Sequence, residues 1–399
     1  MHILVLDTIH GGTTLAHHLA LMGHEVDCVD VYRKETGISP EEAAGRTYDL
    51  VVAPVHLDPA HPLLRGKGAP LISHHEAVRR ILEGREPRPF VEVTGARGKT
   101  TTACAIAHLL PGPGVVSTSI GTWEYPERKL LWRQSITPAS AIDAALHAHE
   151  VGGWCVAEES LGVSGAGEIG VLTSGDDYPV AAAKRRAIAI KQALLSGCNT
   201  VVAAPGVEWP GRNVVHAEKI ARVTGTTCEY AYRGIEGAFS SPLLAVPTYK
   251  SALATAAAAA CLLGIDPAPL AEFRPLPGRM RVERDGDVLV IDDANSGTSA
   301  ATAIEAATLA RAIAPALPLT LVIGQEAHAI CEGFPPEEIR RAIHAIRPER
   351  VVLVGTEAGD AATEPGTDTH YAGTLEEGHM LAREGMREGV ILLAVKSWR

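Results

Sequence analysis

The sequence predicts an α/β protein with parallel sheets, in which a central domain carries a phosphate-binding loop. Two observations predict this class. Short β-branched runs alternate with alanine-rich helical segments along most of the chain, and a glycine turn carrying Lys-Thr directly follows one of those runs. A third observation divides the chain, because proline- and glycine-containing stretches interrupt the alternation near residues 84–89 and 273–279. We therefore expect three domains, at residues 1–87, 88–275 and 276–399.

Composition excludes several classes of protein. The 399 residues are 46% hydrophobic but only 4% aromatic, so we expect cores of Ala, Leu, Val and Ile. A net charge of −11 argues against nonspecific nucleic-acid binding, and no apolar run of ~20 residues predicts a membrane span. The N-terminus lacks the charged start of a signal peptide. Seven dispersed cysteines without a CxxC pair predict reduced thiols in a cytoplasmic protein.

Residues 1–87 have the pattern of a small α/β domain, which we expect to bind an organic substrate. The expected strands are residues 3–6, 25–31, 50–54 and 70–73, with a turn at 11–12 and a helix at 13–22. Asp30 lies where a dinucleotide fold places its ribose-binding acid, but the glycine fingerprint of such a site is incomplete. Nine histidines lie in this domain, and some could contact an acidic or metal-bearing ligand. For any one of them, a surface or turn position is the simpler interpretation.

The central domain begins with the phosphate-binding turn, between an expected strand at 90–94 and an expected helix at 102–110. The turn consists of Gly95, Ala96, Arg97, Gly98, Lys99, Thr100 and Thr101. Glycines let backbone N–H groups approach an anion, and the helix N-terminus adds partial positive charge. Lys99 would reach the terminal phosphates of ATP, and the hydroxyl of Thr100 or Thr101 would hold Mg²⁺. The alternative is a plain βα turn that carries Gly-Lys by coincidence.

Acidic residues follow later strands of the expected sheets. The strands at 154–157 and 170–173 are followed by Glu158-Glu159-Ser160 and by Ser174-Gly175-Asp176-Asp177. Because ligands bind at the carboxyl ends of parallel strands, these carboxylates are expected beside the phosphate loop. In the third domain, Asp292-Asp293 follows a strand at 288–291, and Lys396 follows one at 390–395. Further expected elements are strands at 115–119, 200–203, 319–323 and 350–355 and a turn at 120–122. One helix is expected to start near 137–140, and others are expected at 180–195, 251–263, 300–313 and 336–346.

The joint order of these segments resembles the Mur ligase superfamily, the ATP-dependent ligases of cell-wall peptides and folate polyglutamates. The resemblance covers about residues 90–399. It rests on segments 95–101, 156–160, 170–173, 277–280 and 292–295 and on Lys396. In the first of these segments, the two glycines are separated by two residues, as in the family. It implies a three-domain Mur-ligase-like architecture whose central loop binds ATP. It also implies that Glu158 is a Mg²⁺ ligand and that Arg279 and Asp293 contact the nucleotide.

The resemblance implies two further positions near the metal. Asp177 falls where the family has a metal-binding histidine, so with Thr100 and Glu158 it completes the expected Mg²⁺ ligands. Lys191, fourteen positions later, lies near the spacing of the family's carbamylated lysine, and Lys184 is a rival. An unmodified ammonium beside Mg²⁺ would repel the ion, which is the physical reason for the modification. The alternative for Lys191 is an ordinary surface lysine of a helix.

Departures from the family pattern argue against a routine cell-wall enzyme. The paired asparagines ahead of the alanine helix are replaced near Tyr249 and Ala252, Asn295-Ser296 replaces Ala-His, and the glycine-rich closing box is replaced by residues 395–399. The opening residues 7–12, Asp-Thr-Ile-His-Gly-Gly, and the closing residues 394–399 resemble one archaeal branch of the superfamily. That branch closes the last carbocyclic ring of coenzyme F(430), the nickel tetrapyrrole of methyl-coenzyme M reductase in methanogens.

This resemblance implies acyl-phosphate chemistry with ATP and Mg²⁺ as cofactors. A substrate carboxylate would attack the γ-phosphate, and a carbon of the same nickel tetrapyrrole acid would capture the acyl phosphate. Lys99, Glu158 and a carbamylated Lys191 are the expected catalytic residues, and His10 and Lys396 are candidate substrate contacts. The nickel would belong to the small-molecule substrate, so we expect no protein-bound nickel. Nucleotide-binding residues on both sides of a Pro-Gly hinge imply closure on ATP.

Two other functions remain open from the sequence. The first is an amide-forming peptide ligase, for pseudomurein or another amino-acid acceptor, which shares every ATP-binding residue. The second is a regulatory or binding protein that only senses ATP, which the separate boxes at Glu158, Asp177 and Asp293 disfavour. The sequence does not indicate the oligomeric state.

Overall fold

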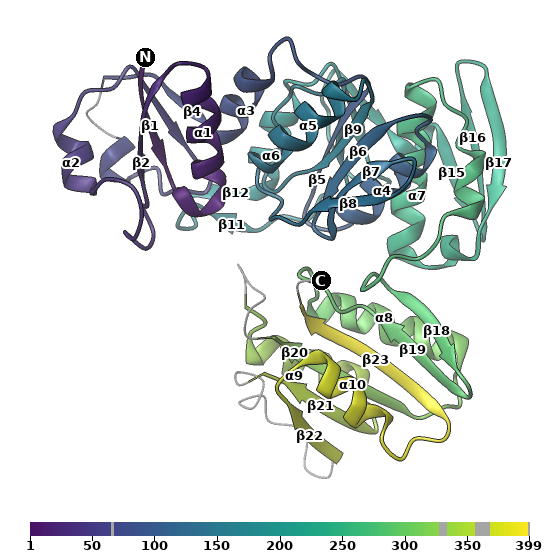
Figure 1. The fold of residues 1–399 in the computed structure, drawn as a ribbon. Helices are drawn as coiled ribbons and strands as arrows, with labels where there is room; N and C mark the ends of the chain where they lie inside the picture. Colours follow the sequence, from purple (N-terminus) through teal and green to yellow (C-terminus); the bar gives the residue numbers. More distant parts are fainter. Residues whose placement is uncertain (65–67, 327–332, 356–367, 398–399) are drawn as a thin grey trace. The chain divides into compact units, whose positions relative to one another are not determined.

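The computed structural model describes residues 1–64, 68–326, 333–355 and 368–397. They form two compact units, Met1–Phe273 and Arg274–Arg399 (Figure 1). The last two residues of the closing segment, Trp398 and Arg399, and one of the seven cysteines, Cys331, lie outside the described residues. No helix in the described part of the chain has the length and apolarity that crossing a membrane requires.

The first unit begins with a four-stranded parallel sheet in the order β2-β1-β3-β4. Its strands are β1 (His2–Leu6), β2 (Glu25–Val29), β3 (Leu50–Ala53) and β4 (Leu71–Ser73), and its helices are α1 (Thr13–Leu21), α2 (Pro40–Gly45) and α3 (His74–Leu82). The four strands and α1 confirm the elements expected from the sequence. Helix α3 was not expected. It begins with a capping box, because Ser73 and Glu76 bond each other's backbone N–H groups.

A second, eight-stranded sheet forms the centre of the same unit, in the order β14-β13-β10-β5-β9-β6-β7-β8. Its strands are β5 (Phe90–Thr94), β6 (Gly114–Thr118), β7 (Gly121–Tyr125), β8 (Lys129–Trp132), β9 (Trp154–Glu158), β10 (Ile169–Leu172), β13 (Thr200–Ala203) and β14 (Val214–His216). Pairing is parallel from β14 to β6 and antiparallel at β7 and β8. The expected turn at 120–122 lies slightly earlier, at 119–120, since Gly121 already belongs to β7. The hairpin is only partly buried, so it lacks the apolar run that marks the inner strands.

The helices around this sheet are α4 (Lys99–Leu109), α5 (Ser140–Glu150), α6 (Ala187–Leu195) and α7 (Pro247–Leu262). The long helix expected at 180–195 is wrong in its first half, because α6 begins only at Ala187. Residues 181–183, three alanines, have φ values of +55° to +60° and connect a two-stranded ribbon, β11 (Pro179–Val180) and β12 (Arg185–Arg186). The ribbon's pairing has overridden the helix propensity of alanine.

An alanine-rich core completes the first unit. Helix α7 is buried along most of its length and packs against α4, which follows the phosphate loop. A three-stranded antiparallel sheet also belongs to this unit and was not expected from the sequence. Its strands are β15 (Ala221–Thr224), β16 (Thr227–Tyr232) and β17 (Ile235–Ser240).

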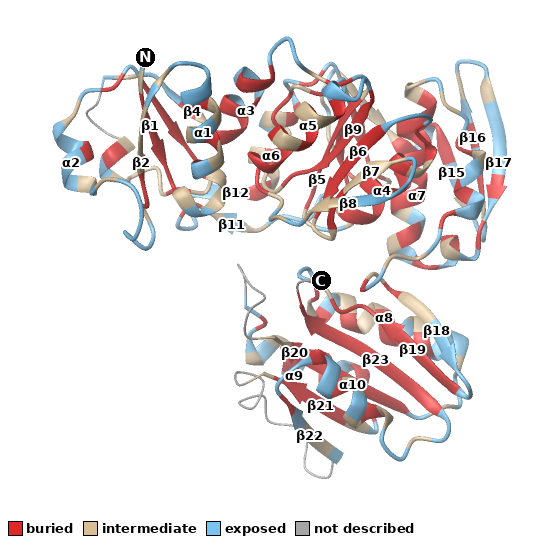
Figure 2. Cartoon of the chain, in the orientation of Figure 1, coloured by how far each residue is buried: buried red, intermediate tan, exposed pale blue. Residues whose placement is uncertain are grey.

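The second unit contains a six-stranded sheet in the order β18-β19-β23-β20-β21-β22. Its strands are β18 (Arg281–Asp285), β19 (Val288–Asp292), β20 (Leu319–Gln325), β21 (Arg350–Val354), β22 (Asp368–Ala372) and β23 (Gly389–Lys396), with helices α8 (Ala300–Ile313), α9 (Pro336–Ile346) and α10 (Leu375–Arg383). The expected parallel pairing is confirmed from β19 to β22, but the unexpected strand β18 is antiparallel. Figure 2 shows the inner strands β19, β20 and β23 as buried and the edge strands β18 and β22 as largely exposed or intermediate.

Candidate active site

The predicted phosphate-binding turn lies between the fully buried strand β5 and helix α4. The helix begins three residues earlier than expected, at Lys99, so that Lys99, Thr100 and Thr101 form its first turn. Gly98 precedes it with φ +81°, a left-handed conformation that a residue with a side chain adopts only with strain. The first-turn N–H groups of α4 therefore face the end of the turn, where an anion is stabilised.

Strand β10 supports the turn through two hydroxyl groups that follow it. The Thr173 hydroxyl donates a hydrogen bond to the carbonyl oxygen of Arg97 (2.6 Å). The Ser174 hydroxyl oxygen accepts hydrogen bonds from the backbone N–H groups of Ala96 (3.0 Å) and Arg97 (3.3 Å). Two of the N–H groups expected to approach a phosphate thus bind Ser174 in this structure. The Arg97 guanidinium points to Asp176, with Nε 2.8 Å from one carboxylate oxygen.

Glu158 is the centre of a buried oxygen cluster at the end of β9. Its Oε2 accepts hydrogen bonds from the Thr100 hydroxyl (2.9 Å) and the Ser119 N–H (3.0 Å), and the Ser119 hydroxyl lies 3.0 Å from the Thr100 hydroxyl. Its Oε1 lies 3.9 Å from Nζ of Lys99. Oxygen ligands of this kind suit Mg²⁺. The structure therefore brings together three of the residues expected at the ATP site, and it adds Ser119.

Two further buried carboxyl groups, of Glu92 and Glu159, interact with each other. Glu92, on β5, accepts hydrogen bonds from the backbone N–H groups of Ser164 (2.8 Å), Gly165 (3.1 Å) and Gly167 (2.8 Å), and from the Ser164 hydroxyl. Glu159 is also fully buried, and neither of its carboxyl oxygens has a hydrogen-bond partner. Burial, and then the charge of Glu92, raise the pKa of Glu159 well above its usual value. The neutral, protonated form of Glu159 is therefore favoured over the carboxylate more strongly than in an exposed glutamate.

The residues expected near a second metal position have other partners. Asp177 accepts hydrogen bonds from the N–H of Ile188 (3.1 Å) and from Arg186 (2.7 Å), and these contacts lower its pKa. Lys184 is half-exposed and pairs with Asp58, which lies between β3 and β4, with its Nζ 2.6 Å from Oδ1. Lys191 is fully buried, and its Nζ lies 3.3 Å from the Tyr178 hydroxyl and 4.6 Å from the centre of that ring.

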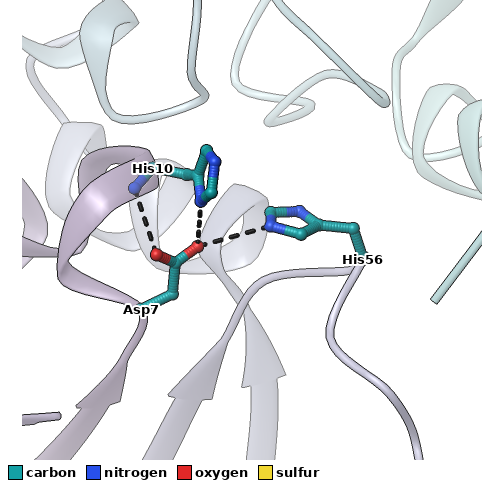
Figure 3. Close-up of side chains that lie close together, drawn as sticks. All are labelled: Asp7, His10 and His56. Atoms are coloured by element: carbon teal, nitrogen blue, oxygen red, sulfur yellow. Dashed lines mark hydrogen bonds and ion pairs between the residues drawn. The ribbon is translucent and has the colours of Figure 1, made fainter. Parts of the chain in front are cut away.

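A third cluster lies at the carboxyl ends of β1 and β3, in the first sheet (Figure 3). Asp7 is fully buried, and its Oδ1 accepts hydrogen bonds from the N–H groups of Ile9 (3.0 Å) and His10 (3.1 Å). Its Oδ2 lies 2.7 Å from His10 Nδ1 and 3.3 Å from His56 Nε2. Burial alone would raise the pKa of Asp7, but the contacts with His10 and His56 outweigh it and lower the pKa. The candidate substrate residue His10 is thus held by a buried carboxylate.

Two adjacent histidines at the start of α3 connect this cluster with the Glu158 segment. His74 donates a hydrogen bond from Nε2 to the carbonyl oxygen of Leu6 (2.9 Å), next to Asp7. His75 donates one to the carbonyl oxygen of Ser160 (3.2 Å). Burial lowers the pKa of His74 to about 4 and that of His75 to about 3. Both rings are therefore neutral at pH 7.

The second unit holds the remaining expected residues. Asp293 is buried, and burial raises its pKa to about 7, although the Thr302 hydroxyl and Arg279 favour the charged form. Its Oδ2 is buried without a hydrogen-bond partner. Arg279 donates a hydrogen bond to the Gly278 carbonyl oxygen (3.2 Å). Lys396, at the end of β23, donates one to the Gly333 carbonyl oxygen (3.0 Å).

Sequence reasoning missed several of these groups. Ser119 follows a strand in the manner of Glu158, so its position was a usable signal. Asp7 stands directly after the first strand, which is the same signal, but no motif connects it with His56, 49 positions later. The pairing of Glu92 with Glu159 left no local signal, because a glutamate inside a β-branched run resembles a surface position.

Comparison with known proteins adds sequence and structural relatives. Residues 282–397 match the protein family described as "Coenzyme F430 synthetase CfbE, C-terminal domain". Over its whole length the chain is 31% identical to the coenzyme F(430) synthetase of Methanosarcina acetivorans and covers 98% of that protein.

Solved structures with the same fold are ligases. A pseudomurein peptide ligase type C from Methanothermus fervidus has a TM-score of 0.56 at 17% identity, over 99% of this chain and 97% of that one. A MurF ligase from Thermotoga maritima, in complex with ADP, has a TM-score of 0.53 at 14% identity, over 90% of this chain and 87% of that one. At these identities the likeness concerns the fold alone.

Proposed function

Since the chain belongs to the coenzyme F(430) synthetase family, we propose that it is an ADP-forming ligase that closes the last carbocyclic ring of a nickel tetrapyrrole acid. The substrate is a small molecule, and ATP supplies the driving force. The single observation that supports this role best is the cluster of Lys99, Thr100, Ser119 and Glu158 at the start of α4.

This cluster has the groups that carboxylate activation needs. A carboxylate and a triphosphate repel each other, so the protein must neutralise charge and position the two groups. Lys99 would neutralise the β- and γ-phosphates, and the N-terminus of α4 adds partial positive charge. Thr100, Ser119 and Glu158 offer oxygen atoms that fit Mg²⁺, which would screen the phosphate charge when bound. Asp177 remains a candidate for a second ion.

The first step forms an acyl phosphate. An oxygen of the substrate carboxylate attacks the γ-phosphorus, the bond between γ-phosphorus and the β–γ bridging oxygen breaks, and ADP leaves. Lys99 stabilises the charge that develops on the phosphoryl oxygens. Carbamylation of the buried Lys191 would replace an ammonium, which repels Mg²⁺, with a carboxylate-like anion that attracts the ion.

The second step forms a carbon–carbon bond within the same molecule. A ring-side carbon of the tetrapyrrole loses a proton and attacks the acyl carbon, and the bond from that carbon to the phosphate oxygen breaks. The products are the closed ring and inorganic phosphate. The first sheet would hold the macrocycle, with His10 as a contact. Arg279 and Asp293 are proposed to contact the nucleotide, and Lys396 the phosphate or acyl oxygen.

The test is ADP release by the purified protein with ATP and Mg²⁺. One arm adds the nickel seco-tetrapyrrole acid and follows its absorption spectrum, and the other adds UDP-linked or peptide acids with amino acids. We expect ADP release only in the first arm, together with a spectral change toward the closed ring. Lys99→Ala should abolish it, whereas Lys129→Ala, an exposed lysine of β8, should not. Release only with the peptide panel would establish an amide-forming ligase instead.

A further inference from the structure

The cluster of Asp7, His10 and His56 has the composition of a metal site that is separate from the ATP site. One carboxylate oxygen and two imidazole nitrogens from these residues lie within 4.8 Å of one another. Two imidazoles with one carboxylate are a ligand set that proteins use for zinc and related first-row divalent ions. The residues come from the ends of two neighbouring parallel strands, β1 and β3, where α/β proteins bind their ligands.

The two distances from Asp7 to the imidazoles lie close to the edges of a coordination shell. Metal–ligand bonds of about 2.0–2.2 Å place neighbouring ligand atoms roughly 3.0–3.5 Å apart. Asp7 Oδ2 lies 2.7 Å from His10 Nδ1 and 3.3 Å from His56 Nε2. The two imidazole nitrogens lie within 4.8 Å of each other, so small side-chain adjustments would place all three atoms around one ion.

The buried ring nitrogen of His56 is a feature that hydrogen bonding within the cluster does not explain. Its Nε2 is buried but forms no hydrogen bond, although it lies 3.3 Å from Asp7 Oδ2. Its one polar contact is thus the ion pair with Asp7; a buried nitrogen without a well-formed hydrogen bond costs free energy, and a metal ion would satisfy it. The Tyr32 ring stacks on His56, at 5.9 Å between ring centres and 12° between planes, and meets His10 edge-on at 5.5 Å. Both imidazoles are thus held in place.

The backbone at Asp7 is also arranged to present its carboxylate. Asp7 has φ +72° and ψ +89°, an uncommon conformation for a residue with a side chain. The turn that follows passes so closely beneath that a Cβ at Gly12 would lie 2.0 Å from the Asp7 carbonyl oxygen. With Oδ1 engaged by two backbone N–H groups, Oδ2 is directed to the two imidazoles.

We propose that Asp7, His10 and His56 bind one divalent transition-metal ion, of which Zn²⁺ is the best match. The ion is held by the protein and is distinct from the nickel of the substrate. A tetrapyrrole already occupies four positions of its metal and leaves one position on each face, so three converging protein ligands suit a free ion. The side chains of His10 and His56 are 35% and 25% exposed, which leaves an open side for a further oxygen ligand.

Zn²⁺ titration of the full chain, stripped of metal and without nucleotide or substrate, tests the proposal. We expect one tight site per chain, with Co²⁺ giving a visible absorption band in the same place. Asp7→Asn and His56→Gln should each weaken binding by at least about tenfold. Asp7→Asn keeps an oxygen for the two N–H bonds, and far-ultraviolet circular dichroism verifies that each variant is folded. His17→Gln, an exposed histidine of α1, should bind like the wild type.

Failure of Zn²⁺ to bind the wild type, or binding that neither variant weakens, would overturn the assignment. Because no ATP or tetrapyrrole is present, this result does not depend on the ligase reaction. A wild-type protein that binds Zn²⁺ but does not close the ring of the tetrapyrrole acid would instead count against the proposed function.

Discussion

The imidazole Nε2 of His75 donates a hydrogen bond to the carbonyl oxygen of Ser160 over 3.2 Å, which connects helix α3 of the first sheet with the segment that carries Glu158. The preceding residue, His74, bonds the Leu6 carbonyl oxygen in the same way, beside Asp7. Two consecutive side chains thus set the Asp7 cluster and the Glu158 cluster relative to each other. Both clusters belong to the same compact unit.

This relationship predicts acid sensitivity of the first unit. The pKa of His75 is lowered to about 3 in the native state, so its ring stays neutral at pH 5. In the unfolded chain its pKa is near 6.5, and the ring binds a proton at that pH. The free energy of unfolding should therefore fall as the pH drops below 6.5, by about 1.4 kcal/mol per pH unit for each such histidine. Urea unfolding between pH 6.5 and 5 measures this slope.

Between pH 6.5 and 5, His75→Gln should reduce the average slope by about 1 kcal/mol per pH unit, whatever its effect on stability at pH 7. His17→Gln, on the surface of α1, is the control and should leave the slope unchanged. Equal slopes in wild type and His75→Gln would contradict a buried neutral His75.

Glu158→Gln should lower the rate of ADP release by at least about 100-fold, because an interaction with Mg²⁺ of several kcal/mol is lost. The amide oxygen can still accept the bonds from Thr100 and Ser119, so the local fold should survive. Steady-state kinetics at increasing Mg²⁺ would show a raised Mg²⁺ requirement. The matched control is Glu168→Gln, an exposed glutamate before β10. A normal rate in Glu158→Gln removes this residue from the site.

Lys191→Arg should inactivate the enzyme, because arginine keeps the positive charge but is not carbamylated. Protein labelled with ¹³C-bicarbonate should show one carbamate signal by nuclear magnetic resonance, absent in Lys191→Arg. Lys184→Arg should keep both the signal and the activity, since Lys184 is paired with Asp58. A carbamate signal that persists in Lys191→Arg would refute the assignment.

Glu159→Gln should leave the protein at least as stable as the wild type at pH 8. The raised pKa means that native Glu159 keeps a proton that the unfolded chain releases above about pH 4.5. Wild-type stability therefore falls as the pH rises above that value, and a neutral amide removes the effect. Glu92→Gln should instead destabilise by at least about 2 kcal/mol, because its carboxylate accepts three backbone N–H bonds. If Glu159→Gln unfolded at a lower temperature than Glu92→Gln, this charge assignment would be disproved.

Much of the molecule followed from local sequence patterns. The α/β class, most strands of the parallel sheets, the coenzyme F(430) synthetase family and a fold shared with Mur-type ligases are confirmed. Strand β5, the turn after it and Glu158 at the end of β9 were accessible because strand, glycine turn and helix are adjacent in sequence. Local propensity failed at residues 181–183, where the pairing of β11 with β12 prevents the helix that three alanines favour.

By itself, then, the sequence determined the fold class, the family and the glycine turn between β5 and α4, because each depends on residues close together along the chain. Only the tertiary structure decided that Ser119 joins Glu158, that Glu92 pairs with Glu159, and that Asp7 and His56 converge. These contacts join residues far apart in sequence. They depend on the order of strands in each sheet, which hydrophobic periodicity does not specify.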